Sequence, residues 1–116
     1  MTDTVELTRT FAALADPTRL TLLSTLAEGE ATVGDLAQPF DLTQQAISKH
    51  LKVLEGAGLI SRRVAAQSRP CRLEVARLEL ALDWIQEQRR VWVDRHDRLE
   101  SHLARLTTEA DEDVQL

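Results

Sequence analysis

The stretch TQQAISKHLKVLEGAGLI at residues 43–60 decides the fold, because it joins a helix cap, a two-faced helix and the start of a strand. Thr43 is a favoured N-cap, and we expect a helix over residues 44–57 that Gly58 closes. The inward face is apolar and holds Ala46, Ile47, Leu51, Leu54 and Ala57. The outward face carries Gln44, Gln45, Ser48, Lys49 and Lys52. Amide, hydroxyl and ammonium groups read base edges in DNA, so this face is predicted to enter a major groove.

The segments on either side of this helix complete a DNA-binding unit. A short helix is expected to begin at Thr32, in a Thr-x-x-Asp start, and to end before Pro39. It would form a helix-turn-helix with the helix at 44–57. Two short strands are expected after it, at residues 59–64 and 71–75, as a hairpin with a basic tip. The arginines predicted to contact the DNA backbone or the minor groove are Arg62, Arg63 and Arg69.

The ends of the chain are predicted to be helical and to hold two copies together. Helices are expected at residues 5–15, from Pro17 to a close at Gly29 and, without any Gly or Pro, at about 77–107. In the last of these an apolar residue recurs every seven positions, at Leu78, Ile85, Trp92, Leu99 and Leu106. One small domain cannot cover so long a stripe, which favours a second chain. The predicted dimer interface consists of Leu7, Phe11, Leu82, Ile85, Trp92, Leu99 and Leu103. A small-ligand pocket is an alternative role for Trp84 and Trp92.

The fold class predicted from these elements is mainly α with a small β-hairpin. The order is four helices, two strands and a long helix, which is a winged helix-turn-helix that forms a homodimer through its terminal helices. One domain is expected over residues 1–108, followed by an acidic, disordered tail over residues 109–116.

Composition limits the classes of protein that this chain could belong to. It has 116 residues, 43% of them hydrophobic, which suits one soluble domain. Its single cysteine, Cys71, excludes an internal disulfide framework and a zinc site built from several thiolates. No apolar run is long enough to span a membrane, and the start of the chain does not resemble a signal peptide. We therefore expect a cytoplasmic protein.

Charge is distributed unevenly along the chain. The net charge is −5, which taken alone disfavours nucleic acid as a partner. Residues 43–77, however, contain seven basic and two acidic side chains, so this segment carries +5 and the remainder −10. A local basic surface is what phosphate binding requires, whatever the total charge.

Two motifs resemble the ArsR/SmtB family of bacterial repressors. One is FAALADPTRL at residues 11–20, and the other is the stretch at 43–60. The resemblance covers residues 7–106 and implies a winged-helix homodimer that binds an inverted-repeat operator and represses transcription until an effector releases it. It also places His50 on the recognition helix near DNA. A structural imidazole beneath that helix is the alternative.

The metal sites of the family do not carry over to this sequence. In the run Thr-Val-Gly-Asp-Leu at residues 32–36, Thr32 and Gly34 stand where the family has two cysteines. A second family site begins with Asp-x-His, which Asp94 and His96 match, but its second half is missing. We predict no metal and no cofactor, with one alternative left open, a site formed by Asp94, His96 and His102 with Glu109 of a second chain.

The role of Cys71 and the signal that the protein senses also stay open. Arginines on either side of Cys71 could lower its pKa and make it oxidisable, or the thiol could be an inert small residue. The chain shows no catalytic constellation, so we expect no enzyme. The predicted function is a sequence-specific, dimeric repressor that binds double-stranded DNA. The alternatives are a winged helix used for protein–protein contact and a metal- or thiol-responsive sensor with an unrecognised site. The effector is unknown.

Overall fold

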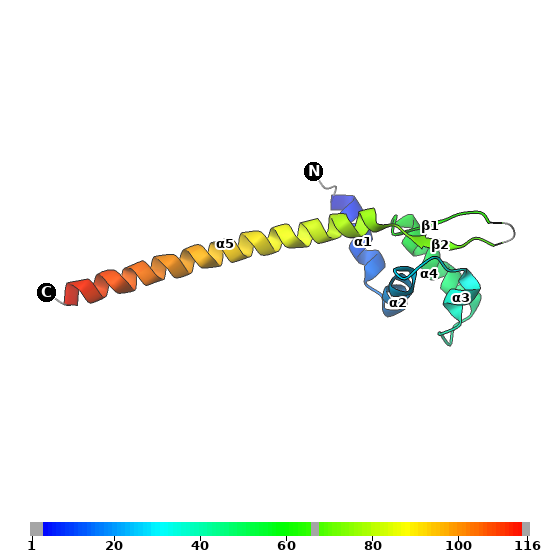
Figure 1. Cartoon of the computed structure of the whole chain (residues 1–116), viewed down its shortest axis with the longest axis horizontal. Helices are drawn as coiled ribbons and strands as arrows, with labels where there is room; N and C mark the ends of the chain where they lie inside the picture. Colours follow the sequence, from blue (N-terminus) through cyan, green and yellow to red (C-terminus); the bar gives the residue numbers. More distant parts are fainter. Residues whose placement is uncertain (1–3, 66–67, 115–116) are drawn as a thin grey trace. The chain divides into compact units, whose positions relative to one another are not determined.

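The computed structural model describes residues 4–65 and 68–114, and it confirms the expected order of helices and strands (Figure 1). The elements are α1 (Thr4–Leu14), α2 (Pro17–Leu26), α3 (Val33–Ala37), α4 (Gln44–Gly56), β1 (Ile60–Arg62), β2 (Cys71–Leu73) and α5 (Val75–Val114). The chain divides into two compact units, one up to residue 82 and one from residue 83 onward. The first unit contains the helix-turn-helix and the hairpin.

Side-chain caps fix where the short helices begin. The Asp16 carboxylate accepts the backbone N–H of Arg19 at 3.0 Å, and Pro17 occupies the first turn of α2. At the start of α3 the Thr32 hydroxyl accepts the N–H of Asp35, whose carboxylate accepts the N–H of Thr32. This reciprocal pair is a capping box, as the sequence predicted.

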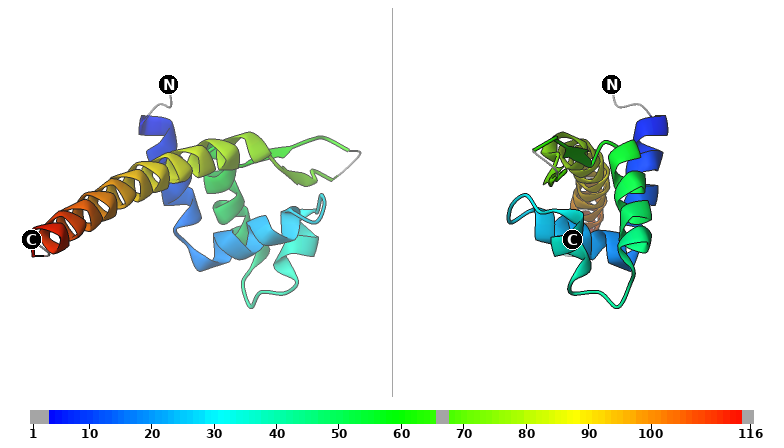
Figure 2. Two further views of the ribbon diagram at one scale, coloured as in Figure 1. Left: turned by 60° about the vertical axis from the view of Figure 1, so that its left-hand side comes forward. Right: turned by 90° about the vertical axis from the view of Figure 1, so that its right-hand side faces the viewer.

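The core of the first unit lies between α2, α3, α4 and the hairpin. The helices α2 and α3 both pack against α4, while β1 packs against α4 and β2 against α2 (Figure 2). The largest side chains that are fully enclosed are Leu22, Leu36, Ile47, Leu51, Leu54, Leu59 and Cys71. Aliphatic side chains, chiefly leucine, therefore supply most of the packing in a chain with only 3% aromatic residues.

The hairpin is antiparallel, and its root is joined to the helical body. Ile60 faces Leu73, and Arg62 faces Cys71. Cys71 also exchanges backbone hydrogen bonds with Ala31, at 2.8 and 3.2 Å, so the segment before α3 pairs with the outer edge of β2. The two arms pair again at Ala65 and Ser68. Both strands are shorter than the ranges expected from the sequence.

The last helix is longer than expected. It begins at Val75 and continues to Val114, past the boundary at residue 108 where we expected a disordered tail. No Gly or Pro interrupts this range, so nothing in the backbone chemistry ends the helix at residue 108. Residues 115 and 116, the rest of the expected tail, lie outside the described residues. Every described side chain from 82 to 111 is exposed except the half-buried Val93.

Candidate nucleic-acid interface

The polar face of α4 is largely exposed. The Thr43 hydroxyl accepts the N–H of Ala46 at 3.1 Å, which starts the helix at Gln44. The exposed side chains are Gln44, Gln45, Lys49 and Lys52, while Ser48 is half-buried. The opposite face is anchored in the core by Ile47, Leu51 and Leu54. The helix therefore presents amides and ammonium groups to solvent from a rigid support.

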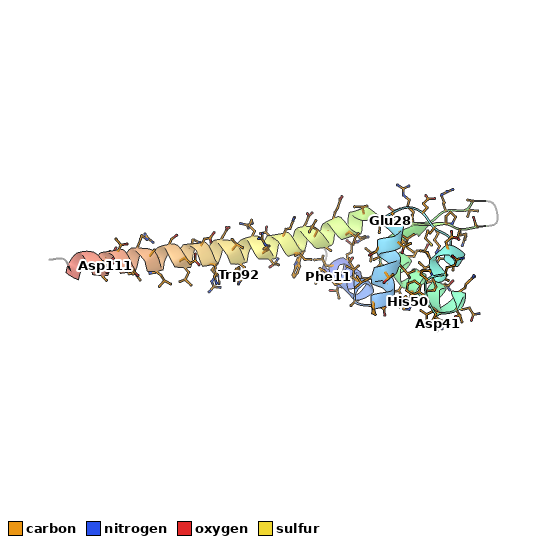
Figure 3. The ribbon with its side chains drawn as sticks, turned by 60° about the horizontal axis from the view of Figure 1, so that its bottom comes forward. Phe11, Glu28, Asp41, His50, Trp92 and Asp111 are labelled. Atoms are coloured by element: carbon orange, nitrogen blue, oxygen red, sulfur yellow. The ribbon has the colours of Figure 1, made fainter. Side chains whose placement is uncertain are left out.

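His50 does not belong to that polar face. Its Nδ1 lies 3.2 Å from Nη1 of Arg19 and 3.8 Å from Oδ2 of Asp16, both at the start of α2. Side chains two positions apart on a helix point in nearly opposite directions, so His50 faces away from Lys52. In Figure 3 it lies among the packed helices. The imidazole joins α4 to α2, which fits the structural alternative, and the inclusion of His50 among the DNA-reading residues stays a prediction.

Arg19 is the centre of this junction. Its Nε donates to the carbonyl of Ala13 at 2.7 Å, and its Nη2 donates to the carbonyl of Ala12 at 3.2 Å. The guanidinium of Arg19, at the start of α2, thus contacts both the end of α1 and His50 on α4. The pKa of Asp16 is lowered, chiefly by the hydrogen bond from the Arg19 backbone and further by the charges of Arg19 and His50.

The wing arginines lie in different environments. Arg69 is exposed beyond the paired strands, and Arg72 is exposed on β2. Arg62 is half-buried, and its Nε and Nη2 atoms are enclosed without a hydrogen-bond partner among the described residues. The guanidinium of Arg62 is therefore partly enclosed, which the sequence did not indicate.

Arg63 is exposed, and its guanidinium is paired with Glu30. Its Nη2 donates to Oε2 of Glu30 at 2.8 Å, and its Nε donates to the same oxygen at 3.1 Å. The hydrogen bonds from Arg63 lower the pKa of the Glu30 carboxyl, and the charges of Arg63 and Arg72 lower it further. The same hydrogen bonds raise the pKa of Arg63. Because 33 residues separate the partners, no local sequence pattern could have revealed this pair.

Cys71 is inaccessible, with 0% of its surface exposed. Burial raises the pKa of its thiol, which outweighs the positive charge of Arg62 nearby. The alternative of a reactive thiol with a lowered pKa is therefore wrong for this fold, and Cys71 is a core residue under the hairpin.

The expected dimer residues differ in their exposure. Leu7 is buried within its own chain, where it stabilises the first unit, and its place in a dimer interface stays a prediction. Phe11 is half-buried. Those on α5 are exposed, namely Leu82, Ile85, Trp92, Leu99 and Leu103. Trp92 exposes 60% of its surface and projects from the helix (Figure 3).

The histidines of α5 form no metal cluster within one chain. His96 stacks on the Trp92 ring, with ring centroids 3.8 Å apart. Among residues 4–65 and 68–114 no group of three His, Cys, Asp or Glu side chains is placed to hold a metal ion. Over the same residues no helix is long and apolar enough to cross a membrane.

Comparison with known proteins places this arrangement in a family. Residues 16–62 match the model of the arsR family of bacterial regulatory proteins. The transcriptional repressor SdpR of Bacillus subtilis (strain 168) is 35% identical over 75 residues, which cover 65% of this chain and 83% of SdpR. The chain belongs to the ArsR family. The resemblance seen at residues 11–20 and 43–60 is confirmed. Several further curated relatives match over about half of their own length.

Solved structures of ArsR-family proteins share the fold. A crystal structure of an ArsR family transcriptional regulator is 36% identical with a TM-score of 0.74, and the match covers 78% of this chain and 94% of that one. A homodimeric winged helix-turn-helix DNA-binding domain from Mycobacterium bovis is 28% identical with a TM-score of 0.59, over 72% and 81% of the two chains. This ArsR-family chain is a DNA-binding transcriptional regulator of the winged helix-turn-helix class, and its relatives are regulators rather than enzymes.

Proposed function

We propose that this ArsR-family chain is a homodimeric repressor that binds an inverted-repeat operator with α4 in the major groove and the wing on the backbone or in the minor groove. The observation that carries the proposal is the polar face of α4, which is exposed while the opposite face is locked into the core. Such a repressor would act in the cytoplasm, where the operator lies.

The start of α4 offers the chemistry for base recognition. Recognition helices approach base edges with their first residues, and here these are Gln44 and Gln45. Glutamine can form two hydrogen bonds to adenine, and lysine can bind the acceptors of guanine. The proposed contact residues on this element are Thr43, Gln44, Gln45, Ser48, Lys49 and Lys52.

The wing would add contacts that do not depend on sequence. Arg69 and Arg63 are exposed, and guanidinium groups bind phosphate through paired hydrogen bonds. Because the exposed apolar side chains of α5 would pack against a second copy, two α4 helices would be presented together. The homodimeric Mycobacterium bovis domain supports this assembly. Two-fold symmetry in the protein calls for two-fold symmetry in the operator.

Selection of bound duplexes from a random pool, at about 150 mM salt, tests the proposal with the purified full chain. We expect an inverted repeat. On that site Gln44→Ala should reduce discrimination at one base position in each half-site by roughly tenfold, since a bidentate contact contributes about 1–3 kcal/mol. Gln86→Ala removes an equally exposed amide from α5 and should change nothing. Unchanged base preference in Gln44→Ala would remove Gln44 from the set of reading residues.

A pool that yields no sequence above background would overturn the repressor proposal. A winged helix used for protein–protein contact would then become the better explanation, since a fold alone does not determine function. The salt dependence of binding separates the two, because phosphate contacts weaken steeply as salt rises.

A further inference from the structure

We infer that the Glu30 carboxylate competes with DNA phosphate for the guanidinium of Arg63. This competition limits how tightly the protein binds DNA of arbitrary sequence. The inference rests on the proposed DNA-binding function. It assigns to Glu30, in the segment between α2 and α3, a role in setting the strength of the wing contact.

The position of Glu30 is fixed by its surroundings. The next residue, Ala31, is held to Cys71 by two backbone hydrogen bonds, which places the Glu30 carboxylate at the root of the wing. There it accepts hydrogen bonds from Nε and Nη2 of Arg63. The positive charge of Arg72 on β2 also acts on it. The carboxylate is thus paired with one arginine of the wing, Arg63.

This arrangement reduces the charge that the wing offers to DNA. Binding of a cationic side chain to phosphate is driven by the release of counterions from the DNA. An arginine already paired with a carboxylate is close to neutral as a unit, so it attracts phosphate less. Arg63 contributes its full charge to DNA binding only when a phosphate replaces the carboxylate and accepts the same pair of hydrogen bonds.

The exchange is feasible because the pair lies at the surface. The Arg63 side chain is 61% exposed and that of Glu30 is 33% exposed. Water and salt screen such pairs, so they contribute little to stability and break readily. Removing the carboxylate should therefore leave the fold intact and free the guanidinium for DNA.

The experiment is a salt titration of binding to a 30-base-pair duplex of random sequence, with the full chain and Glu30→Gln. We expect the variant to bind several-fold more tightly at about 100 mM salt. Its plot of log affinity against log salt should be steeper by about one, which corresponds to one more phosphate neutralised. Thermal unfolding of the variant should match that of the parent chain.

Glu28→Gln is the matched control. It makes the same change of charge two residues away, at the exposed Glu28 (labelled in Figure 3), for whose side chain the described residues supply no hydrogen bond or ion pair. A larger gain in DNA affinity in Glu30→Gln than in Glu28→Gln then reports the pairing of Glu30 with Arg63. When Arg63 is also replaced by alanine, the difference in affinity gain between the two glutamine variants should become smaller.

Two results would overturn the inference. Equal effects of Glu30→Gln and Glu28→Gln would mean that only net charge matters. Weaker binding by Glu30→Gln would mean that Glu30 orients Arg63 for DNA and does not compete with it. If the parent chain showed no salt-dependent affinity for any duplex, the proposed function itself would be overturned. This result is distinct from failure of the Glu30 inference, because it is seen in the parent chain without any variant.

Discussion

Asp16 has two roles at the junction behind the recognition helix. It caps α2 through the N–H of Arg19, and its carboxylate lies 3.8 Å from His50 on α4. Arg19 completes the junction by holding the last carbonyls of α1. The orientation of α4 therefore depends on a small polar cluster as well as on the leucine core. His50 contacts Arg19 and Asp16 and so holds α4 against the start of α2.

The lowered pKa of Asp16 predicts a contribution to acid stability. A carboxyl whose pKa is below its ordinary 3.8 in the folded protein stabilises the fold above that value, and the contribution disappears as pH falls through the lower folded pKa. Between about pH 4.5 and pH 2, a range below that in which histidines titrate, the parent chain should lose stability more steeply than Asp16→Asn. Asparagine keeps the cap, so the variant should fold.

Urea unfolding at a series of pH values measures this difference. Asp41→Asn is the control, because Asp41 is exposed and forms no hydrogen bond or ion pair with the residues that the structure describes. Its stability profile should run parallel to that of the parent chain. Parallel profiles for Asp16→Asn as well would show that the capping hydrogen bond does not persist in solution.

At the scale of elements, the junction between α4 and β1 depends on one glycine. Gly58 has a φ of 76°, in the left-handed region, and a Cβ there would meet Nε of Arg77 at 2.9 Å. Gly58→Ala should destabilise the fold by about 1–2 kcal/mol, since an L-residue is strained in this conformation. The Arg77 side chain, which pairs with Glu6 of α1, would also have to move.

Gly56→Ala, two residues earlier, provides the comparison for that prediction. Gly56 is the last residue of α4, and a Cβ there meets nothing within 4 Å. Alanine at this position should be neutral or stabilising by roughly 0.5–1 kcal/mol. Urea unfolding should show changes in the free energy of unfolding that have opposite signs in the two variants, or a clearly larger loss in Gly58→Ala. Equal losses would mean that the φ at Gly58 imposes no special requirement.

Periodicity and capping chemistry predict the elements of this chain well. Thr43, Gly58 and the apolar spacing of α4 act within a few residues, so sequence alone locates that helix and its polar face. Contacts between distant segments are different. The Glu30–Arg63 pair and the Arg19–His50 contact join residues more than 30 positions apart. Both Cys71 and His50 were ambiguous in sequence because their surroundings, not their neighbours in the chain, decide their burial.

At the scale of the whole molecule, the exposed apolar side chains of α5 favour the proposed homodimer. Ile85, Trp92 and Leu99 recur every seven residues, and each exposes close to half or more of its surface. A continuous apolar stripe of this kind marks a protein–protein interface. The repeat of seven residues is the spacing at which helices pair along a seam. A second copy is the partner that the proposed inverted-repeat operator requires.

Trp92→Asp should therefore convert the dimer to a monomer at micromolar concentration, because it places a charge in the centre of the seam. Ser101→Asp is the matched control. Ser101 lies nine residues further along α5, two and a half turns away and so on the opposite face of the helix. Sedimentation velocity should show a monomer for Trp92→Asp and a dimer for Ser101→Asp.

Binding of the inverted repeat should weaken at least tenfold in Trp92→Asp only, because each half-site is then bound separately. A variant that stays dimeric would show that the stripe on α5 is not the dimer interface, and the ligand-pocket role for Trp92 would then account better for its exposure.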